Sequence, residues 1–164
     1  MTDGYWTEGS ISGLDNSDNQ AGPSITNPSS QPNSATHSYT PALPYSDAYS
    51  DTLADAAMQY WKNDLRTDLP NKVPTNLHDP AFWQHLVNFT VGLGVTGTLT
   101  TLPSGGQSWP DPTTSDAAKI DDLWHAAVNS RGDFFSAADP TAFTNALSNA
   151  LKAIVARTGS ASAV

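Results

Sequence analysis

The sequence predicts an α/β fold in which a parallel sheet is flanked by helices, and three observations support this prediction. Apolar residues alternate with small or polar ones from Val87 to Val95, which is typical of a β-strand. Segments with helical spacing come before and after this strand, and such alternation favours a parallel sheet. Only one strong strand is visible, although a parallel sheet needs several, so we expect further strands to be encoded before Met1.

Composition and charge exclude several classes of function. The chain has 164 residues and a formal net charge of -9, which repels phosphate backbones and argues against a nucleic-acid partner. It has no Cys, which excludes disulfides and thiolate chemistry. No segment approaches the roughly 20 apolar residues that span a bilayer. The first residues, Met1 to Gly4, lack the basic and apolar regions of a signal peptide, so we expect neither membrane insertion nor an export signal in this chain.

Four segments follow from the composition along the chain. Residues 1–7 are expected to hold the end of a sheet strand and a Thr-Asp-Gly turn. Residues 8–46 are rich in Ser, Asn and Pro and offer few large apolar side chains, so we expect a disordered or mobile insertion. The folded part is then expected in residues 47–159, with a frayed tail in residues 160–164.

The first helix is expected from a cap at Ser50 to about Arg66. Its apolar residues recur on one face at helical spacing: Leu53, Ala57, Tyr60, Trp61 and Leu65. Asp79 followed by Pro80 combines a capping residue with the residue favoured at the first helical position. This pair predicts a short helical turn that leads into the strand from Val87 to Val95.

The second half of the chain shows two further helical patterns. Ser115 is expected to cap a helix with one apolar stripe (Ile120, Leu123, Trp124, Ala127 and Val128), which ends at a left-handed Gly132. Phe134 and Phe135 are expected to form a short strand. Asp139 and Pro140 then begin a last helix, which ends before Gly159 and has an apolar face expected to be buried: Phe143, Leu147, Ala150, Leu151 and Ile154.

Several stretches, in this order, resemble a known family. They are residues 1–6 (MTDGYW), 65–74 (LRTDLPNKVP), 83–85 (WQH), 89–94 (FTVGLG), 119–132 (KIDDLWHAAVNSRG), 134–137 (FFSA) and 139–140 (DP). Together they are similar to the PilC/PilY family of type IV pilus biogenesis and tip adhesin proteins. Only the loop from Ser10 to Pro44 and the extreme tail fall outside the resemblance.

The resemblance implies that this chain is the C-terminal half of a von Willebrand factor A-like domain, a doubly wound parallel sheet, within a longer parent protein. The parent is expected to be exported to the outer membrane, the cell surface or the pilus tip. It would act in pilus assembly and surface adhesion through protein contacts and would not be an enzyme. The implied partners are pilus proteins such as minor pilins, a host or abiotic surface, and the remainder of the parent.

The resemblance also implies a metal-ion-dependent adhesion site for Mg²⁺ or Ca²⁺. In the family its ligands come from an Asp-x-Ser-x-Ser motif, a Thr in a middle loop, and the Asp of a Thr-Asp-Gly turn. Only the last of these maps onto this chain, as Asp3. Hard cations need several oxygen ligands, so we expect this chain alone to bind no metal there. The alternative role of Asp3 is to cap a turn with Gly4.

Other residues that could carry chemistry have ordinary structural interpretations. The four His residues (His37, His78, His85 and His125) form no close metal-binding pattern, so we expect surface or partly buried imidazoles. The adjacent Asp121 and Asp122 indicate a solvated helix face. Trp61, Trp83 and Trp124 are expected in the core, whereas Trp6 and Trp109 are expected to be exposed.

Two alternatives to a pilus protein remain at this point. The first is a free-standing α/β domain that binds a ligand or resembles a hydrolase, although the sequence has no Gly-x-Ser-x-Gly elbow and no phosphate-binding loop with Lys. The second is a truncated product with no independent function, whose incomplete sheet would expose apolar edges.

Overall fold

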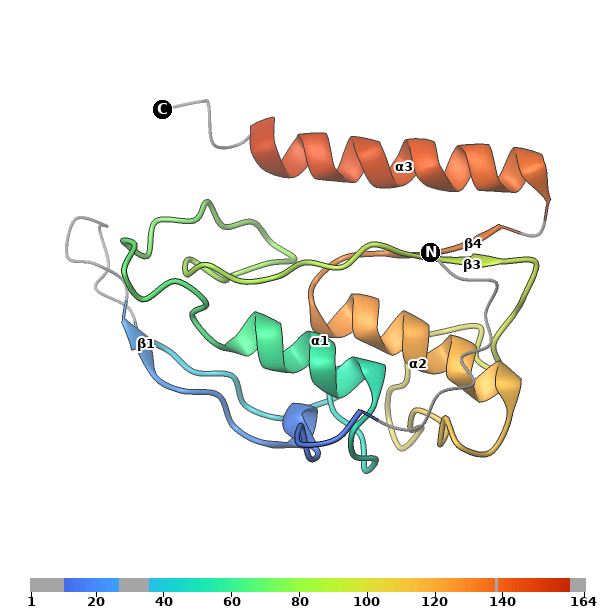
Figure 1. Cartoon of the computed structure of the whole chain (residues 1–164), viewed down its shortest axis with the longest axis horizontal. Coiled ribbons are helices and arrows are strands. Elements are labelled where there is room, and N and C mark those ends of the chain that lie inside the picture. Colours follow the sequence, from blue (N-terminus) through green and yellow to red (C-terminus); the bar gives the residue numbers. More distant parts are fainter. Residues whose placement is uncertain (1–10, 27–35, 138, 160–164) are drawn as a thin grey trace.

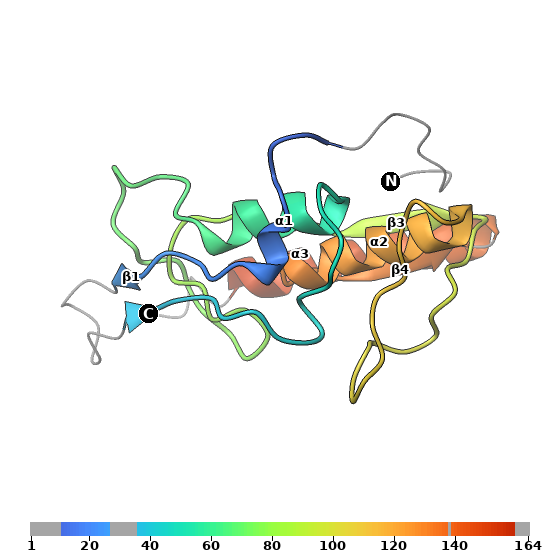
Figure 2. The same cartoon turned by 90° about the horizontal axis from the view of Figure 1, so that it is seen from below.

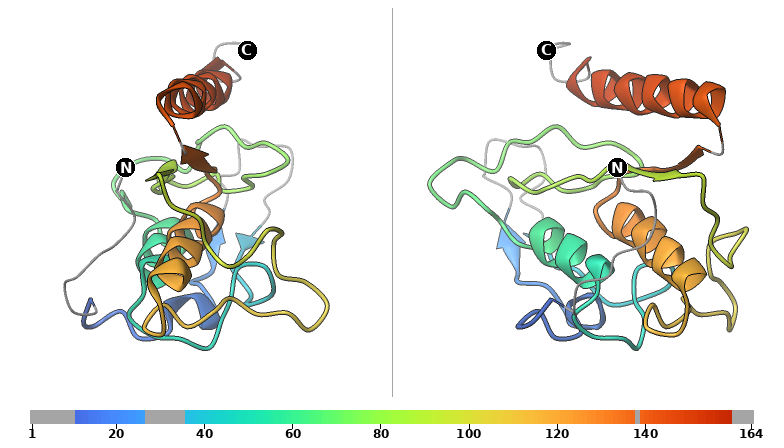
Figure 3. Two further views of the ribbon diagram at one scale, coloured as in Figure 1. Left: turned by 90° about the vertical axis from the view of Figure 1, so that its right-hand side faces the viewer. Right: turned by 45° about the vertical axis from the view of Figure 1, so that its right-hand side comes forward.

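The computed structural model describes residues 11–26, 36–137 and 139–159, and these residues form three layers (Figure 1). A two-stranded parallel sheet lies in the middle, with α1 and α2 on one face and α3 on the other. The main elements are α1 (Leu53–Lys62), β3 (Thr90–Leu93), α2 (Asp116–Asn129), β4 (Phe134–Ala137) and α3 (Pro140–Gly159). Figure 3 shows the layers end-on in its left view. The mixed α/β class with a parallel sheet is therefore confirmed.

The central sheet pairs the strongest expected strand with the short one that follows α2. Thr90 is aligned with Phe134 and Leu93 with Ala137. β3 is shorter than the expected Val87 to Val95, because Gly94 adopts a left-handed conformation (φ 69°) that turns the chain away after Leu93. Thr90, Val91 and Gly92 are all buried, as expected for a strand covered on both faces.

Helix α1 differs from its predicted boundaries at both ends. Thr52, not Ser50, is the N-cap, and it forms a capping box in which its hydroxyl accepts the Asp55 N–H. The helix ends at Lys62, four residues before the expected Arg66. Its buried face includes Ala54, Ala57, Met58 and Trp61, whereas Tyr60 and Leu65 of the predicted stripe are exposed.

The helical turn predicted after Asp79 is absent from the described residues, where residues 79–89 form no helix. The Asp79 carboxylate accepts the Trp61 indole N–H at 3.2 Å and the Ala81 N–H at 3.3 Å. Asp79 was expected to cap a helix. Its carboxylate instead links an irregular segment to α1.

Helix α2 begins as predicted, since the Ser115 hydroxyl accepts the Ala118 N–H. Its end is different, because the left-handed residue is Arg131 (φ 62°) and not Gly132. Gly132 is needed for another reason: a Cβ at this position would collide with the Asn88 carbonyl. The pattern thus located the end of the helix and misidentified the residue that makes the turn.

The described parts of the 8–46 segment pack against α1, which differs from the expected mobile insertion. A 3-10 turn, η1 (Ser17–Asn19), buries Ser17 and Asp18, and β1 (Ile25–Thr26) pairs with β2 (Thr36–His37) in an antiparallel ladder. Tyr39 packs with Trp61 and donates its hydroxyl hydrogen to the Asp18 carbonyl at 2.6 Å. Polar residues are ordered here by hydrogen bonds, which composition alone does not reveal.

Helix α3 buries only part of the face predicted for it. Ala146 and Ala150 are buried, and Phe143 packs against the cluster of Val91 and Ala137. Three leucine and isoleucine side chains expected in the core are exposed instead: Leu147 at 41%, Leu151 at 54% and Ile154 at 41%. Leu147, Leu151 and Ile154 are four and three residues apart, so they form one stripe of the helix beside the buried alanines, and the second half of α3 also extends beyond β3 and β4 (Figure 1).

Figure 2, seen from the side of α1 and α2, shows these helices, the strands and α3 lying behind one another. Within the part of the chain that the structure describes, no helix is both long enough and apolar enough to cross a bilayer.

Candidate functional site

The carboxylates predicted to lie on a solvated helix face are buried, and this interpretation of Asp121 and Asp122 was wrong. The Asp122 oxygens accept the Leu53 and Ala54 N–H groups at 3.1 Å, at the start of α1. The Asp121 carboxylate accepts the N–H groups of Thr98 and Leu99 at 2.9 and 3.2 Å. Adjacent residues on a helix point in different directions, and here both directions lead to backbone amides that need acceptors.

A cluster of buried polar side chains lies between the N-terminal segment and α2. It consists of Asp18 from η1, Asp47 from the loop before α1, and His125 and Asn129 from α2. His125 Nε2 lies 3.5 Å from Asp18 Oδ2, and His125 Nδ1 lies 3.4 Å from Asp47 Oδ2. The Asn129 amide donates to Asp18 Oδ2 at 3.1 Å, and the Asp47 N–H donates to Asp18 Oδ1 at 3.2 Å. This cluster holds the N-terminal segment against α2.

Burial changes the acidity of the carboxylates in and beside this cluster. Loss of solvent raises the pKa of Asp18 to about 7, although the facing His125 favours the charged form. Burial also raises the pKa of Asp122 to about 6, against the opposing effect of the two backbone N–H groups that it accepts. The pKa of Asp55 is raised by burial too. The surrounding protein therefore stabilises these negative charges incompletely.

The four His residues occupy different environments, and the expectation of surface or partly buried imidazoles is wrong for one of them. His78 is exposed. His85 contacts Asp79 at 3.0 Å and the Trp83 carbonyl at 2.7 Å, and His37 packs on Trp83. Only His125 is fully buried beside two carboxylates. Asp18, Asp47 and His125 are far apart in the sequence, so no spacing rule could have found the cluster.

One tryptophan assignment is wrong and a second holds only in part. Trp109, expected to be exposed, is 1% exposed and stacks on His125 with ring centroids 4.3 Å apart. Its indole N–H donates to the Pro44 carbonyl at 2.7 Å, which ties an irregular loop to the buried layer. Trp124, expected in the core, is only half-buried, whereas Trp61 and Trp83 are buried as predicted. Trp6 lies outside the described residues.

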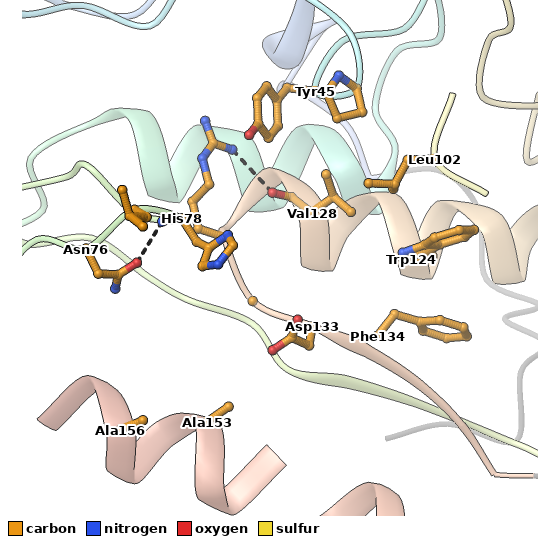
Figure 4. Close-up of a pocket in the computed structure, with 14 residues that line it drawn as sticks. Tyr45, Asn76, His78, Leu102, Trp124, Val128, Asp133, Phe134, Ala153 and Ala156 are labelled. Atoms are coloured by element: carbon orange, nitrogen blue, oxygen red, sulfur yellow. Dashed lines mark hydrogen bonds between the residues drawn. The ribbon is translucent and has the colours of Figure 1, made fainter. Parts of the chain in front are cut away.

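A cavity of about 760 Å³ lies between α3 and the layer that contains α2 (Figure 4). Ala153 and Ala156 of α3 form one wall, and His78 and Asp133 belong to the opposite side. Trp124 and Phe134 are stacked with centroids 6.1 Å apart and close one end. The cavity thus lies beneath the part of α3 that extends past the strands.

Asp3, the residue that the family resemblance assigns to a Mg²⁺ or Ca²⁺ site, lies outside the described residues. The geometry of that site is therefore not defined by this structure, and its role stays a prediction.

Comparison with known proteins identifies relatives along nearly the whole chain. A protein named Type IV pilus biogenesis factor PilY1, from Pseudomonas aeruginosa strain UCBPP-PA14, is 36% identical over 197 aligned residues, covering 99% of this chain and 16% of the relative. The proteins of the same name from strains PAK and PAO1 are 35% and 34% identical and cover 94% of the chain. The chain therefore spans about a sixth of the length of these relatives. No family model matches the chain, and no solved structure gives a significant match.

Proposed function

The chain belongs to the PilC/PilY family of type IV pilus biogenesis proteins, and from this premise we propose that it acts in pilus assembly and surface adhesion through protein contacts. The observation that carries the proposal is the extent of the similarity, which covers 94–99% of the chain in proteins named as pilus biogenesis factors. Pilus proteins, such as minor pilins, and a host or abiotic surface are the partners we propose.

The burial and hydrogen bonds of the α2 carboxylates support a non-enzymatic role. General acid–base catalysis requires a carboxyl group within hydrogen-bonding reach of a substrate. Asp121 and Asp122 instead direct their oxygens to backbone N–H groups in buried positions. Such contacts build the fold and leave these oxygens poorly placed for a substrate.

We further propose that the chain contributes to a wider doubly wound sheet of the von Willebrand A type. Two parallel strands with helices on both faces are the repeating unit of such a sheet. Leu147, Leu151 and Ile154 on α3 expose apolar surface that further strands from the rest of the polypeptide would cover. In the completed sheet, Asp3 would join oxygen ligands from elsewhere in the protein to hold Mg²⁺ or Ca²⁺.

The proposed function is tested in cells that encode this chain. An in-frame deletion of residues 11–159 is compared with the wild type by counting surface pili in electron micrographs and by measuring attachment per piliated cell. We expect fewer pili, weaker attachment, or both. Normal values for both would contradict a role in pilus assembly and adhesion.

An Asp3→Ala variant separates the two parts of the proposal. If Asp3 holds an adhesion cation, pilus number stays normal while attachment falls and no longer depends on added Mg²⁺ or Ca²⁺. Attachment that keeps its full cation dependence in this variant would remove Asp3 from the proposal and leave the assembly role standing.

A further inference from the structure

We propose that Asp18, Asp47 and His125 bind one divalent transition-metal ion of the zinc class, which joins the N-terminal segment to α2. This site shares no residue with the turn that contains Asp3, and it does not depend on the proposed role in adhesion.

The His125 and Asp47 ligand atoms are spaced for one ion, and the Asp18 carboxylate lies beside the same imidazole, 3.5 Å from its Nε2. One ligand atom from each residue lies within 4.8 Å of the others. Zinc binds nitrogen and carboxylate oxygen at roughly 2.0–2.2 Å, so two of its ligands lie at most about twice that distance apart. The 3.4 Å between His125 Nδ1 and Asp47 Oδ2 falls within this limit.

The hydrogen-bonding state of His125 supplies the second argument. Its Nε2 lies 3.2 Å from the Tyr45 carbonyl, which can only accept, so Nε2 carries a hydrogen. In the neutral ring Nδ1 then has a lone pair, and this buried atom has no hydrogen-bond partner among the described residues. This nitrogen lies 3.4 Å from Asp47 Oδ2. Two electron-rich atoms at this distance repel each other unless a cation lies between them.

The neighbours of the three residues are arranged as those of metal ligands commonly are. A ligating imidazole normally donates its other N–H to a carbonyl or carboxylate, as His125 does to Tyr45. Asp47 Oδ1 accepts the Tyr49 N–H at 2.8 Å, which fixes the carboxylate and leaves Oδ2 directed at His125. The Trp109 ring covers one face of the imidazole. These contacts pre-orient the ligand atoms and shield them from water.

Two carboxylates and one imidazole meet in the cluster, so a divalent ion matches the charge of the carboxylates once both are ionised. Asp55 and Asp122 also lie near the cluster, but both accept N–H groups at the start of α1. Lys62, the nearby cationic side chain, donates to the Ser17 and Gln20 carbonyls. A proton on His125 would bring one positive charge to the two carboxylates of Asp18 and Asp47. A divalent ion would balance both.

The donor set indicates the class of ion. Mg²⁺ and Ca²⁺ prefer sites made entirely of oxygen ligands. One imidazole nitrogen and two carboxylates suit zinc and its neighbours in the first transition row, with a water or a carbonyl completing the coordination. The site therefore differs in chemistry from the oxygen-only site that the family resemblance implies for Asp3.

The full chain, stripped with EDTA and dialysed, is titrated with ZnCl₂ by isothermal calorimetry and melted with and without the ion. We expect one equivalent to bind and the Tm to rise by roughly 5–10 °C at a hundredfold excess over Kd. MgCl₂ and CaCl₂ should give much smaller shifts. Absence of saturable one-to-one zinc binding would overturn the proposal.

Variants assign the binding to these residues. Asp47→Asn keeps an acceptor for the Tyr49 N–H while removing the charge, and we expect its zinc affinity to fall by about tenfold or more. His125→Gln should bind no zinc at this site. His78→Gln, at an exposed imidazole, is the control and should bind as the wild type does. Wild-type affinity in Asp47→Asn would refute the assignment.

Nitrogen NMR of the unaltered chain gives a result that does not depend on the folding of any variant. We expect the His125 Nδ1 resonance to shift on addition of zinc at neutral pH, with Nε2 still protonated. If both ring nitrogens carry hydrogen and zinc changes neither resonance, His125 is an imidazolium held between two carboxylates. That result would overturn the proposed metal site.

Discussion

The two layers that cover the sheet are built in opposite ways. On one side, α1, α2 and the N-terminal segment bury three Trp residues and satisfy buried carboxylates with backbone N–H groups. On the other side, α3 contacts the strands through alanines and Phe143, while Leu147, Leu151 and Ile154 remain exposed. The first layer is closed by contacts within this chain. The second has an apolar surface that the described residues cover only in part, so the layers should differ in stability and in their response to mutation.

The largest expected effect comes from truncating the centre of the closed layer. Trp61 is fully buried, contacts Trp83, and lies under the Arg131 guanidinium at 3.7 Å. Trp61→Ala should lower the free energy of unfolding by about 3–5 kcal/mol, measured by urea denaturation. Phe143→Ala beneath α3 is the matched truncation and should cost clearly less, because Phe143 is only half-buried. Equal costs would remove the difference between the layers.

The pH dependence of the free energy of unfolding gives the next test of the closed layer. Burial raises the pKa of Asp122 from 3.8 to about 6, so the folded state favours the protonated carboxyl. Its contribution to stability is complete below pH 4 and is lost as the pH rises towards 6. The unfolding free energy of the wild type, relative to Asp122→Asn, should therefore fall by roughly 2.4 kcal/mol between pH 4 and pH 7. A pH-independent difference between the two proteins would show that burial does not perturb Asp122.

The sequence predicted the helices and strands better than it predicted which side chains are buried between them. The alternation around Thr90–Leu93, the cap at Ser115 and the Asp139-Pro140 start are local signals, and the structure contains the elements that they predict. Such signals depend on residues that are neighbours along the chain, so they can be detected without knowledge of the tertiary fold.

The closed layer depends on contacts between distant residues, which local patterns do not encode. Asp122 caps a helix 68 residues away, and Asn129 bonds to Asp18 across 111 residues. These partners turn apparently solvated carboxylates into buried ones and order a segment whose composition favours disorder. In contrast, Leu147 and Ile154 have the periodicity of a buried face, yet burial requires a sheet wider than the two described strands.

Equivalent caps on the two layers provide a sharper comparison. Thr52 caps α1, and the Asp139 carboxylate accepts the N–H groups of Thr141 and Ala142 at the start of α3. Thr52→Ala should lower global stability by about 1 kcal/mol, with Thr52→Ser as a control that retains the hydroxyl. Asp139→Ala should mainly increase hydrogen exchange within α3 and leave the global transition nearly unchanged. A global loss as large as that of Thr52→Ala would mean that α3 unfolds together with the closed layer.

The smallest effect on the isolated chain should come from the exposed stripe of α3. Replacing Leu147 and Leu151 together by Asp should change the unfolding free energy by less than about 1 kcal/mol, because both side chains are about half-exposed. In cells the same double variant should reduce pilus number or attachment, since charges would then face the strands proposed to cover α3. Leu69→Asp is the control, because Leu69 is 42% exposed and lies outside both the stripe and the lining of the cavity. Normal piliation and attachment in the double variant would mean that this face of α3 stays in solvent, and the wider sheet would lose its main structural support.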